Sequence, residues 1–205
     1  KSKGRPKVTA NKFIINEVHD IDDDGEFNLK DVAKQLKANK HNEWTPLDAD
    51  GDFRSDECIN LLKQSDIVAT NPPFSLFREY LKQLVDHDKK FLIIGSMNAL
   101  KYANIFPLIK NNKIWIGVSN GAKTYIKPDK TEQKMGNTCW LTNIDHGRRH
   151  QPLPLMTKAE VIKFITKKPF QKYDNYDAIE VSQVKNIPSD YKGAIGVPIS
   201  FLDKY

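Results

Sequence analysis

The chain has 205 residues, of which 39% are hydrophobic and 28% charged, a balance typical of a folded domain with a real core. No apolar run reaches the roughly 20 residues needed to cross a bilayer, and the basic start Lys1–Lys7 is not followed by the apolar segment of a secretory signal. The formal net charge of +6 favours a polyanionic partner. Cys58 and Cys139 lie far apart in apolar patterns, which indicates free core cysteines in a reducing compartment, the cytoplasm.

Apolar periodicity predicts strands that alternate with helices along the chain. Strands are expected at 13–18, 44–47, 67–69, 91–95, 114–118, 138–144, 176–181 and 195–201. Helices are expected at 28–39, 55–64, 75–87 and 105–111 and after Thr157, with Asn28, Ser55 and Thr157 as caps and Glu160 completing a capping box. The alternation predicts an α/β fold with a largely parallel sheet, and the continuous apolar strands predict helices on both of its faces.

Residues 1–205 are expected to form a single domain, which 138–205 completes with strands and a helix. The stretch 119–137, just before this last part, is polar and contains four lysines and two glycines. It is predicted to be a mobile surface loop and a candidate nucleic-acid contact.

The stretch Asn71-Pro72-Pro73-Phe74 carries the strongest chemical signal, because it joins the buried strand at 67–69 to an amphipathic helix. The Asn71 side-chain oxygen and the Pro72 carbonyl can each accept one hydrogen from an exocyclic amine, which makes the amine nitrogen a better nucleophile. Pro73 stiffens the turn, and Phe74 offers a face on which a base can stack. A base inside a duplex must be flipped out to reach such a turn. The alternative is a plain structural turn at a strand end.

Gly51-Asp52-Phe53 ends the preceding predicted strand. A carboxylate there can accept a hydrogen bond from the adenine amine of a cofactor, and Phe53 can flank that ring. Ligands of open α/β sheets bind beyond the carboxyl ends of the strands, so we expect these residues to share one pocket with Asn71. Taken alone, Gly-Asp-Phe is more often an ordinary turn.

Six segments together resemble the EcoRI-type adenine-specific DNA methyltransferases, which use S-adenosylmethionine. They are Gly51–Ser55, Asn71–Tyr80, Phe91–Gly95, Trp140–His146, Tyr173–Val181 and Gly196–Tyr205, and they extend over roughly the last three quarters of the chain. The resemblance implies a Rossmann-like methyltransferase sheet and methyl transfer to N6 of adenine in double-stranded DNA, in a restriction-modification system or by a solitary enzyme.

The resemblance also implies roles for single residues. Asn71, Pro72 and Phe74 would hold the target base, and Asp52 with Phe53 would bind the cofactor adenine. Glu17 would accept a hydrogen bond from the cofactor ribose, although a solvated acid at a strand end is the competing interpretation.

The sequence departs from this family at one place. Such enzymes bind the methionine end of the cofactor at a glycine-rich loop after the first strand, and no Gly-x-Gly occurs in the 205 residues. The chain is therefore expected to open at the second strand of the sheet, without the first strand and the cofactor loop.

Two charged regions have competing interpretations. Asp20, Asp22, Asp24, Gly25, Glu26 and Asp31 follow the spacing of a calcium loop, but a solvated acidic hairpin is favoured because a strand precedes them and Asp replaces the last Glu. The basic residues Arg148, Arg149, His150, Lys163, Lys167, Lys168 and Lys172 could contact phosphate or form a solvated face. No His/Cys cluster indicates zinc, so no metal site is predicted.

The Asn-Pro-Pro-Phe turn alone does not distinguish adenine in DNA from other planar amines. RNA adenine, cytosine N4 and a protein glutamine amide present the same –NH2 group. A non-catalytic DNA-binding fragment is the alternative from another class, and the oligomeric state is left open.

Overall fold

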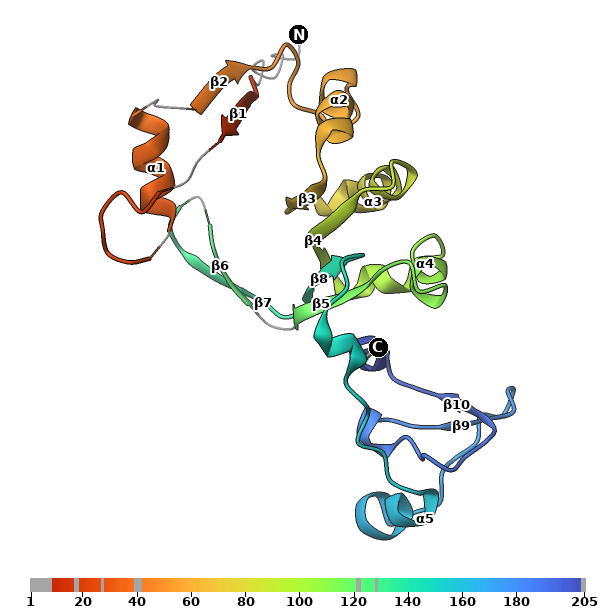
Figure 1. Ribbon diagram of the computed structural model, residues 1–205. Coiled ribbons are helices and arrows are strands. Elements are labelled where there is room, and N and C mark those ends of the chain that lie inside the picture. The colour runs from red at the N-terminus through yellow and green to blue at the C-terminus, as the bar shows by residue number, and fades with distance from the viewer. Residues whose placement is uncertain are drawn as a thin grey trace. The chain divides into compact units, whose positions relative to one another are not determined.

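The computed structural model describes residues 9–16, 19–26, 28–38, 42–120, 123–127 and 129–203 (Figure 1). The chain divides into two compact units, Lys1–Ser65 and Asp66–Tyr205. The assignment of residues 1–205 to a single domain stays a prediction. Within the described ranges, no helix is both long enough and apolar enough to cross a membrane.

The first unit contains a two-stranded sheet, β1 (Asn11–Ile15) and β2 (Asn42–Pro46), and two helices, α1 (Leu29–Ala38) and α2 (Asp56–Gln64). Both strands were predicted with slightly different bounds. They pair antiparallel, with Phe13 opposite Trp44, whereas a parallel arrangement was expected.

Both helices of the first unit begin at the predicted caps. The Asn28 side-chain oxygen accepts from the Lys30 amide at 2.9 Å, and the Ser55 hydroxyl accepts from the Cys58 amide at 3.2 Å. These bonds satisfy amides that the first helical turn leaves without a partner. Local side-chain chemistry therefore fixes where both helices start.

The second unit is built on a four-stranded sheet in the order β3-β4-β8-β5. Its strands are β3 (Ile67–Thr70), β4 (Lys90–Ser96), β8 (Thr138–Thr142) and β5 (Trp115–Asn120). β3 and β4 are parallel, but β8 is antiparallel to both β4 and β5. The α/β class is confirmed, whereas the largely parallel sheet is not found in the described strands, because β8 runs against its neighbours.

The main core lies where α3 (Phe77–Asp86) packs on this sheet; Figure 1 shows α3 and α4 (Phe106–Lys110) on the same side of it. Every second residue of β4 is buried, at positions 91, 93 and 95, against the apolar stripe Phe77, Leu81 and Leu84 of α3. The alternate β4 residues, Leu92 and Ile94, are only half-buried. A second layer of helices, expected on that opposite face, is not seen in the described part of this unit.

The stretch 119–137 was expected to be a structureless loop. Its described residues instead contain an antiparallel hairpin, β6 (Lys123–Ile126) and β7 (Glu132–Met135). These strands are mostly exposed and lack the apolar alternation on which the prediction of strands depended. The mobility of the segment and its contact with nucleic acid stay predictions.

The end of the chain forms a separate small core of Ile179, Val181 and Ile187 beneath partly buried apolar neighbours. Strand β9 (Ala178–Glu180) pairs parallel with β10 (Ala194–Gly196), and both are shorter than predicted. Thr157 and Glu160 form the predicted capping box at the start of α5 (Lys158–Glu160). The helix continues as a π-helix, Val161–Thr166, so the predicted helix is confirmed with a different hydrogen-bond pattern.

Candidate active site

The Asn-Pro-Pro-Phe turn lies directly after β3, at the edge where the parallel strands β3 and β4 both end. Pro72 is buried and anchors the turn, whereas Asn71, Pro73 and Phe74 are exposed. The next residues form a short 3₁₀ helix, Phe74–Leu76, that leads into α3. The turn is thus fixed on one side by the sheet and on the other by a helix that packs on the core.

Hydrogen bonding divides the acceptors of this turn into two groups. The Pro73 carbonyl accepts from the Leu76 amide at 3.0 Å and starts the 3₁₀ helix. Among the residues that the structure describes, neither the Asn71 side chain nor the Pro72 carbonyl has a hydrogen-bond partner. These are the two acceptors that the sequence assigned to an exocyclic amine; Asn71 is exposed, whereas Pro72 is buried as a residue.

An aromatic surface adjoins the turn. The Phe74 side chain is 44% exposed, as a base-stacking ring must be. Arg78, one helical turn further on, lies over the ring of Tyr102 at 5.3 Å, and that ring is 42% exposed. Tyr102 follows the 3₁₀ segment Met97–Lys101 after β4, and the sequence pattern did not single it out.

Asp52 and Phe53 lie in a tight turn of the first unit. Gly51 before them has φ +78°, and an added Cβ would lie 2.6 Å from the Ala10 Cβ, so this position requires glycine. Arg54 donates three hydrogen bonds to the Asp52 carboxylate, through its amide and Nε to Oδ1, both at 2.9 Å, and through its guanidinium to Oδ2 at 2.6 Å.

These bonds from the Arg54 side chain and amide lower the pKa of Asp52 to about 2, so the group is a carboxylate at neutral pH. A carboxylate has about four acceptor positions, and Arg54 fills three of them. One position on Oδ2 remains for a ligand amine. The half-buried Phe53 ring beside it lies 5.5 Å from the Arg54 guanidinium carbon.

The predicted site residues fall in different parts of the chain. Asn71 to Phe74 belong to the second unit, whereas Asp52 and Phe53 belong to the first. Their common pocket stays a prediction. Glu17, expected at the cofactor ribose, lies outside the described residues.

Comparison with known proteins identifies the family of this chain. A family described as "Adenine-specific methyltransferase EcoRI" matches residues 2–205. The chain is 51% identical over 173 residues to "Type II methyltransferase M.EcoRI" of Escherichia coli, a match that covers 76% of this chain and 52% of that protein. The chain belongs to the EcoRI family of adenine-specific methyltransferases.

Two further relatives of this family member come from mycoplasmas. It is 42% identical over 176 residues to "Type II methyltransferase M.MpnI" of Mycoplasma pneumoniae, covering 77% of this chain and 54% of the relative. It is 38% identical over 179 residues to "Type II methyltransferase M.MgeORF184P" of Mycoplasma genitalium, covering 78% and 55%. The chain thus spans about half the length of the curated relatives it matches. No solved structure matches it.

In the acidic segment of this family member, the described residues 19–26 contain no strand, so the favoured hairpin is not seen among them. Ligand oxygens of Asp20, Asp22 and Asp24 lie within 4.8 Å of one another. Asp31, which would be the last calcium ligand, is fully buried and accepts from the amides of Asn28 at 2.9 Å and Ile21 at 3.0 Å. These backbone bonds lower the pKa of Asp31, and they give this carboxylate a structural role at the start of α1.

Part of the predicted basic surface is internal. Arg149 is only 15% exposed at its side chain, and its guanidinium carbon lies 3.6 Å from the centre of the Trp115 ring. It donates to Asp145 at 2.7 Å and to Asn112 at 2.6 Å. Arg149 is therefore a structural cation that ties β5 to the segment after β8, and neither predicted role, phosphate contact or solvated face, describes it.

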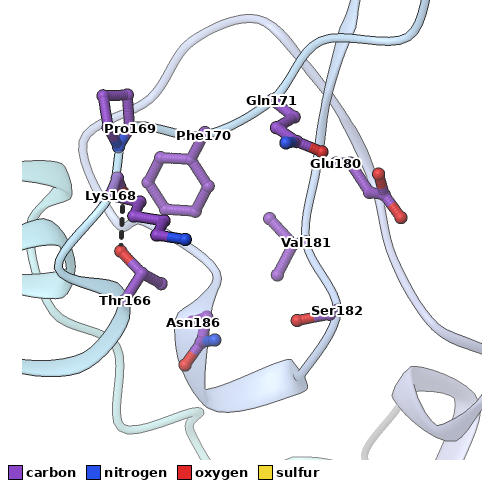
Figure 2. Close-up of a pocket in the computed structure, with 9 residues that line it drawn as sticks. All are labelled: Thr166, Lys168, Pro169, Phe170, Gln171, Glu180, Val181, Ser182 and Asn186. Carbon is purple, nitrogen blue, oxygen red and sulfur yellow. Dashed lines mark hydrogen bonds between the residues drawn. The ribbon is translucent and has the colours of Figure 1, made fainter.

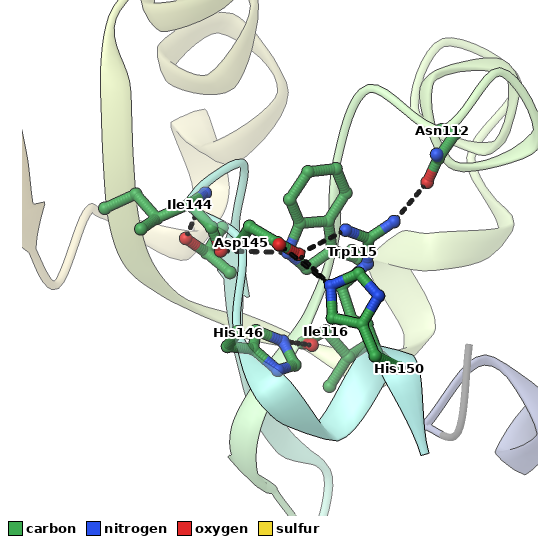
Figure 3. Close-up of polar contacts among 9 residues, drawn as sticks. Asn112, Trp115, Ile116, Ile144, Asp145, His146 and His150 are labelled. Carbon is green, nitrogen blue, oxygen red and sulfur yellow. Dashed lines mark hydrogen bonds and ion pairs between the residues drawn. The ribbon is translucent and has the colours of Figure 1, made fainter. Parts of the chain in front are cut away.

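Asp145 is the centre of this network. It also binds His150 at 2.8 Å, and the hydrogen bonds from His150 and Arg149 lower the pKa of Asp145 against the opposing effect of burial. Trp115 donates its ring N–H to the Ile144 carbonyl at 3.0 Å (Figure 3). The spacing of Asp145 and Arg149, four residues apart, is the sequence signal from which their pairing could have been predicted.

Proposed function

We propose that the protein to which this chain belongs transfers a methyl group from S-adenosylmethionine to N6 of an adenine flipped out of double-stranded DNA. The observation that carries this proposal is the Asn71–Phe74 turn, with its two unoccupied acceptors and its exposed ring. Family membership supports the adenine target, and the names of the relatives, all type II methyltransferases, support a restriction-modification role. No observation favours RNA, cytosine or protein glutamine as the substrate.

Each residue of the turn would have its own role in catalysis. The Asn71 side-chain oxygen and the Pro72 carbonyl accept the two hydrogens of the adenine amine, which holds the nitrogen lone pair out of conjugation with the ring. Pro73 stiffens the turn, so these dipoles act without reorganising. Phe74 stacks on the extruded base, an interaction worth about 1–3 kcal/mol per base.

The cofactor would be held at its adenine end by the remaining acceptor of Asp52 and by the Phe53 ring. S-adenosylmethionine, when bound, supplies an activated methyl group. The 205 residues contain no Gly-x-Gly sequence for its methionine end, so we assign that contact to no residue of this chain. We further propose a Rossmann-like sheet for the complete domain, a contact of Glu17 with the cofactor ribose, and a cytoplasmic location.

The test compares the full-length protein with its Asn71→Ala variant on unmodified duplex DNA, with N6-methyladenine measured by mass spectrometry after digestion to nucleosides. Removing one preorganised polar contact to the reacting group should lower kcat by about 100-fold or more. DNA and cofactor binding should stay close to wild type. Asn60→Ala, which removes an exposed amide from α2, is the matched control and should leave turnover unchanged. Unchanged turnover in Asn71→Ala would refute the role of the turn.

A further inference from the structure

A cavity of about 230 Å³ lies in the C-terminal part of the second unit. Its lining includes the side chains of Lys168, Phe170, Ser182 and Asn186 (Figure 2). The volume is below the range of about 300–1,000 Å³ usual for sites that bind drug-sized molecules. The cavity therefore suits a small polar group better than a complete cofactor.

Asn186 is the unusual residue of this cavity. Its side chain is only 6% exposed, and its Oδ1 atom is buried without a hydrogen-bond partner in the described part of the chain. Burying an amide oxygen without a hydrogen bond is unfavourable. Figure 2 shows the amide nitrogen of Asn186 on the side of Ser182, so an acceptor in the cavity would bind its N–H groups, whereas Oδ1 would need a donor and would stay unpaired.

Two more donors face the same space. Figure 2 shows the Lys168 ammonium and the Ser182 hydroxyl turned toward the space beneath the Phe170 ring, with the Glu180 carboxylate pointing to the other side. Within the described ranges, Lys168 and its neighbour Lys167 have no carboxylate partner.

The next lysine along the chain behaves differently. Lys172 is bound to Asp177 at 3.2 Å, and this hydrogen bond raises the pKa of Lys172. Of these three lysines, Lys167 and Lys168 therefore have no carboxylate partner among the described residues, and Lys168 lines the cavity.

We infer that this cavity binds one backbone phosphate of the DNA, held by Lys168, Ser182 and Asn186. An ammonium, a hydroxyl and an amide N–H are all donors to phosphate oxygens, and a phosphate is small enough for the volume. The ligand class follows from the cavity, and its source in DNA rests on the proposed function. Such a contact positions the duplex but reads no sequence.

The experiment measures DNA affinity of the full-length protein over a series of salt concentrations, for wild type, Lys168→Ala and Ser182→Ala. Each phosphate contact contributes about 0.9 to the slope of log K against log salt. Lys168→Ala should lower the magnitude of that slope by about 0.9 and weaken binding equally on two duplexes of unrelated sequence. Ser182→Ala, which removes no charge, should weaken binding with little change in slope. Lys110→Ala, which removes an exposed lysine of α4, is the control and should change neither quantity.

Three results would overturn the inference. An unchanged slope in Lys168→Ala would mean that the cavity holds only water. Weakening on one duplex sequence alone would indicate base reading instead of phosphate binding. Saturable binding of inorganic phosphate by calorimetry, lost in Lys168→Ala while DNA affinity is retained, would assign the cavity to a free anion. Methylation by the same proteins is measured separately: its absence in wild type would refute the proposed function without affecting the salt slope.

Discussion

Gly95 of β4 should control the stability of the candidate active site, because a side chain at this position would collide with Phe77 of α3. An added Cβ would lie 2.8 Å from Phe77 Cζ, 2.9 Å from Phe77 Cε2 and 2.8 Å from Leu141 Cδ1. The Leu141 methyl can rotate away, but the Phe77 ring is 3% exposed and has no free space into which to move. Gly95→Ala should therefore push the first turn of α3 outward.

Overpacking of this kind lowers the free energy of unfolding by about 1–3 kcal/mol. For a domain of about 150–250 residues each kcal/mol lowers Tm by about 2–4 °C, so the expected loss is about 2–12 °C. Because Phe77 lies three residues after Phe74, methyl transfer should fall as well. Scanning calorimetry of the full-length protein measures the first effect, and initial methylation rates measure the second.

A double-mutant cycle identifies the cause. Phe77→Leu shortens the side chain that meets the new methyl group, so the double variant should recover about 0.5–3 kcal/mol relative to the sum of the single effects. Gly136→Ala is the matched control, because an added Cβ there meets nothing within 4 Å, and its Tm should stay within about 2 °C of wild type. A wild-type Tm for Gly95→Ala, or strictly additive effects in the cycle, would refute the reasoning.

Two further predictions concern arginines. Arg54→Ala should raise the pKa of Asp52 from about 2 toward its ordinary value of 3.8. The lowered pKa stabilises the fold above about pH 4, and this contribution is lost as the pH falls through 2, so the variant should lack this pH-dependent stability. An NMR titration of the variant that still gives a pKa of about 2 for Asp52 would contradict the prediction. Arg149→Lys keeps the charge but loses the planar stack on Trp115 and the hydrogen bonds to Asp145 and Asn112. The free energy of unfolding, measured by calorimetry, should fall by about 2 kcal/mol. Arg78→Lys, at an exposed position, is its control and should cost under about 0.5 kcal/mol; equal losses in the two variants would contradict a structural role for Arg149.

The parts of the fold that could be predicted are those decided by neighbouring residues. Ser55 and Thr157 cap their helices as expected, because the bond partner of each cap lies three residues away. The direction of β8 could not be predicted in this way. Its apolar pattern is the same in either direction, and its orientation depends on pairing with β4 about 50 residues earlier and on the path through the β6–β7 hairpin. Arg149 was misread for the same reason, since Asn112 and Trp115 are more than 30 residues away.

The Asn-Pro-Pro-Phe turn could be recognised from sequence because its chemistry is almost entirely local. Two successive prolines remove two backbone N–H groups, so the backbone between Asn71 and Phe74 presents carbonyls and no donors. Pro73 uses its carbonyl to start the following 3₁₀ helix, and the Pro72 carbonyl has no hydrogen-bond partner among the described residues. A surface that offers acceptors suits an –NH2 group and disfavours a carbonyl, which is why we propose that the turn takes the exocyclic amine of a base.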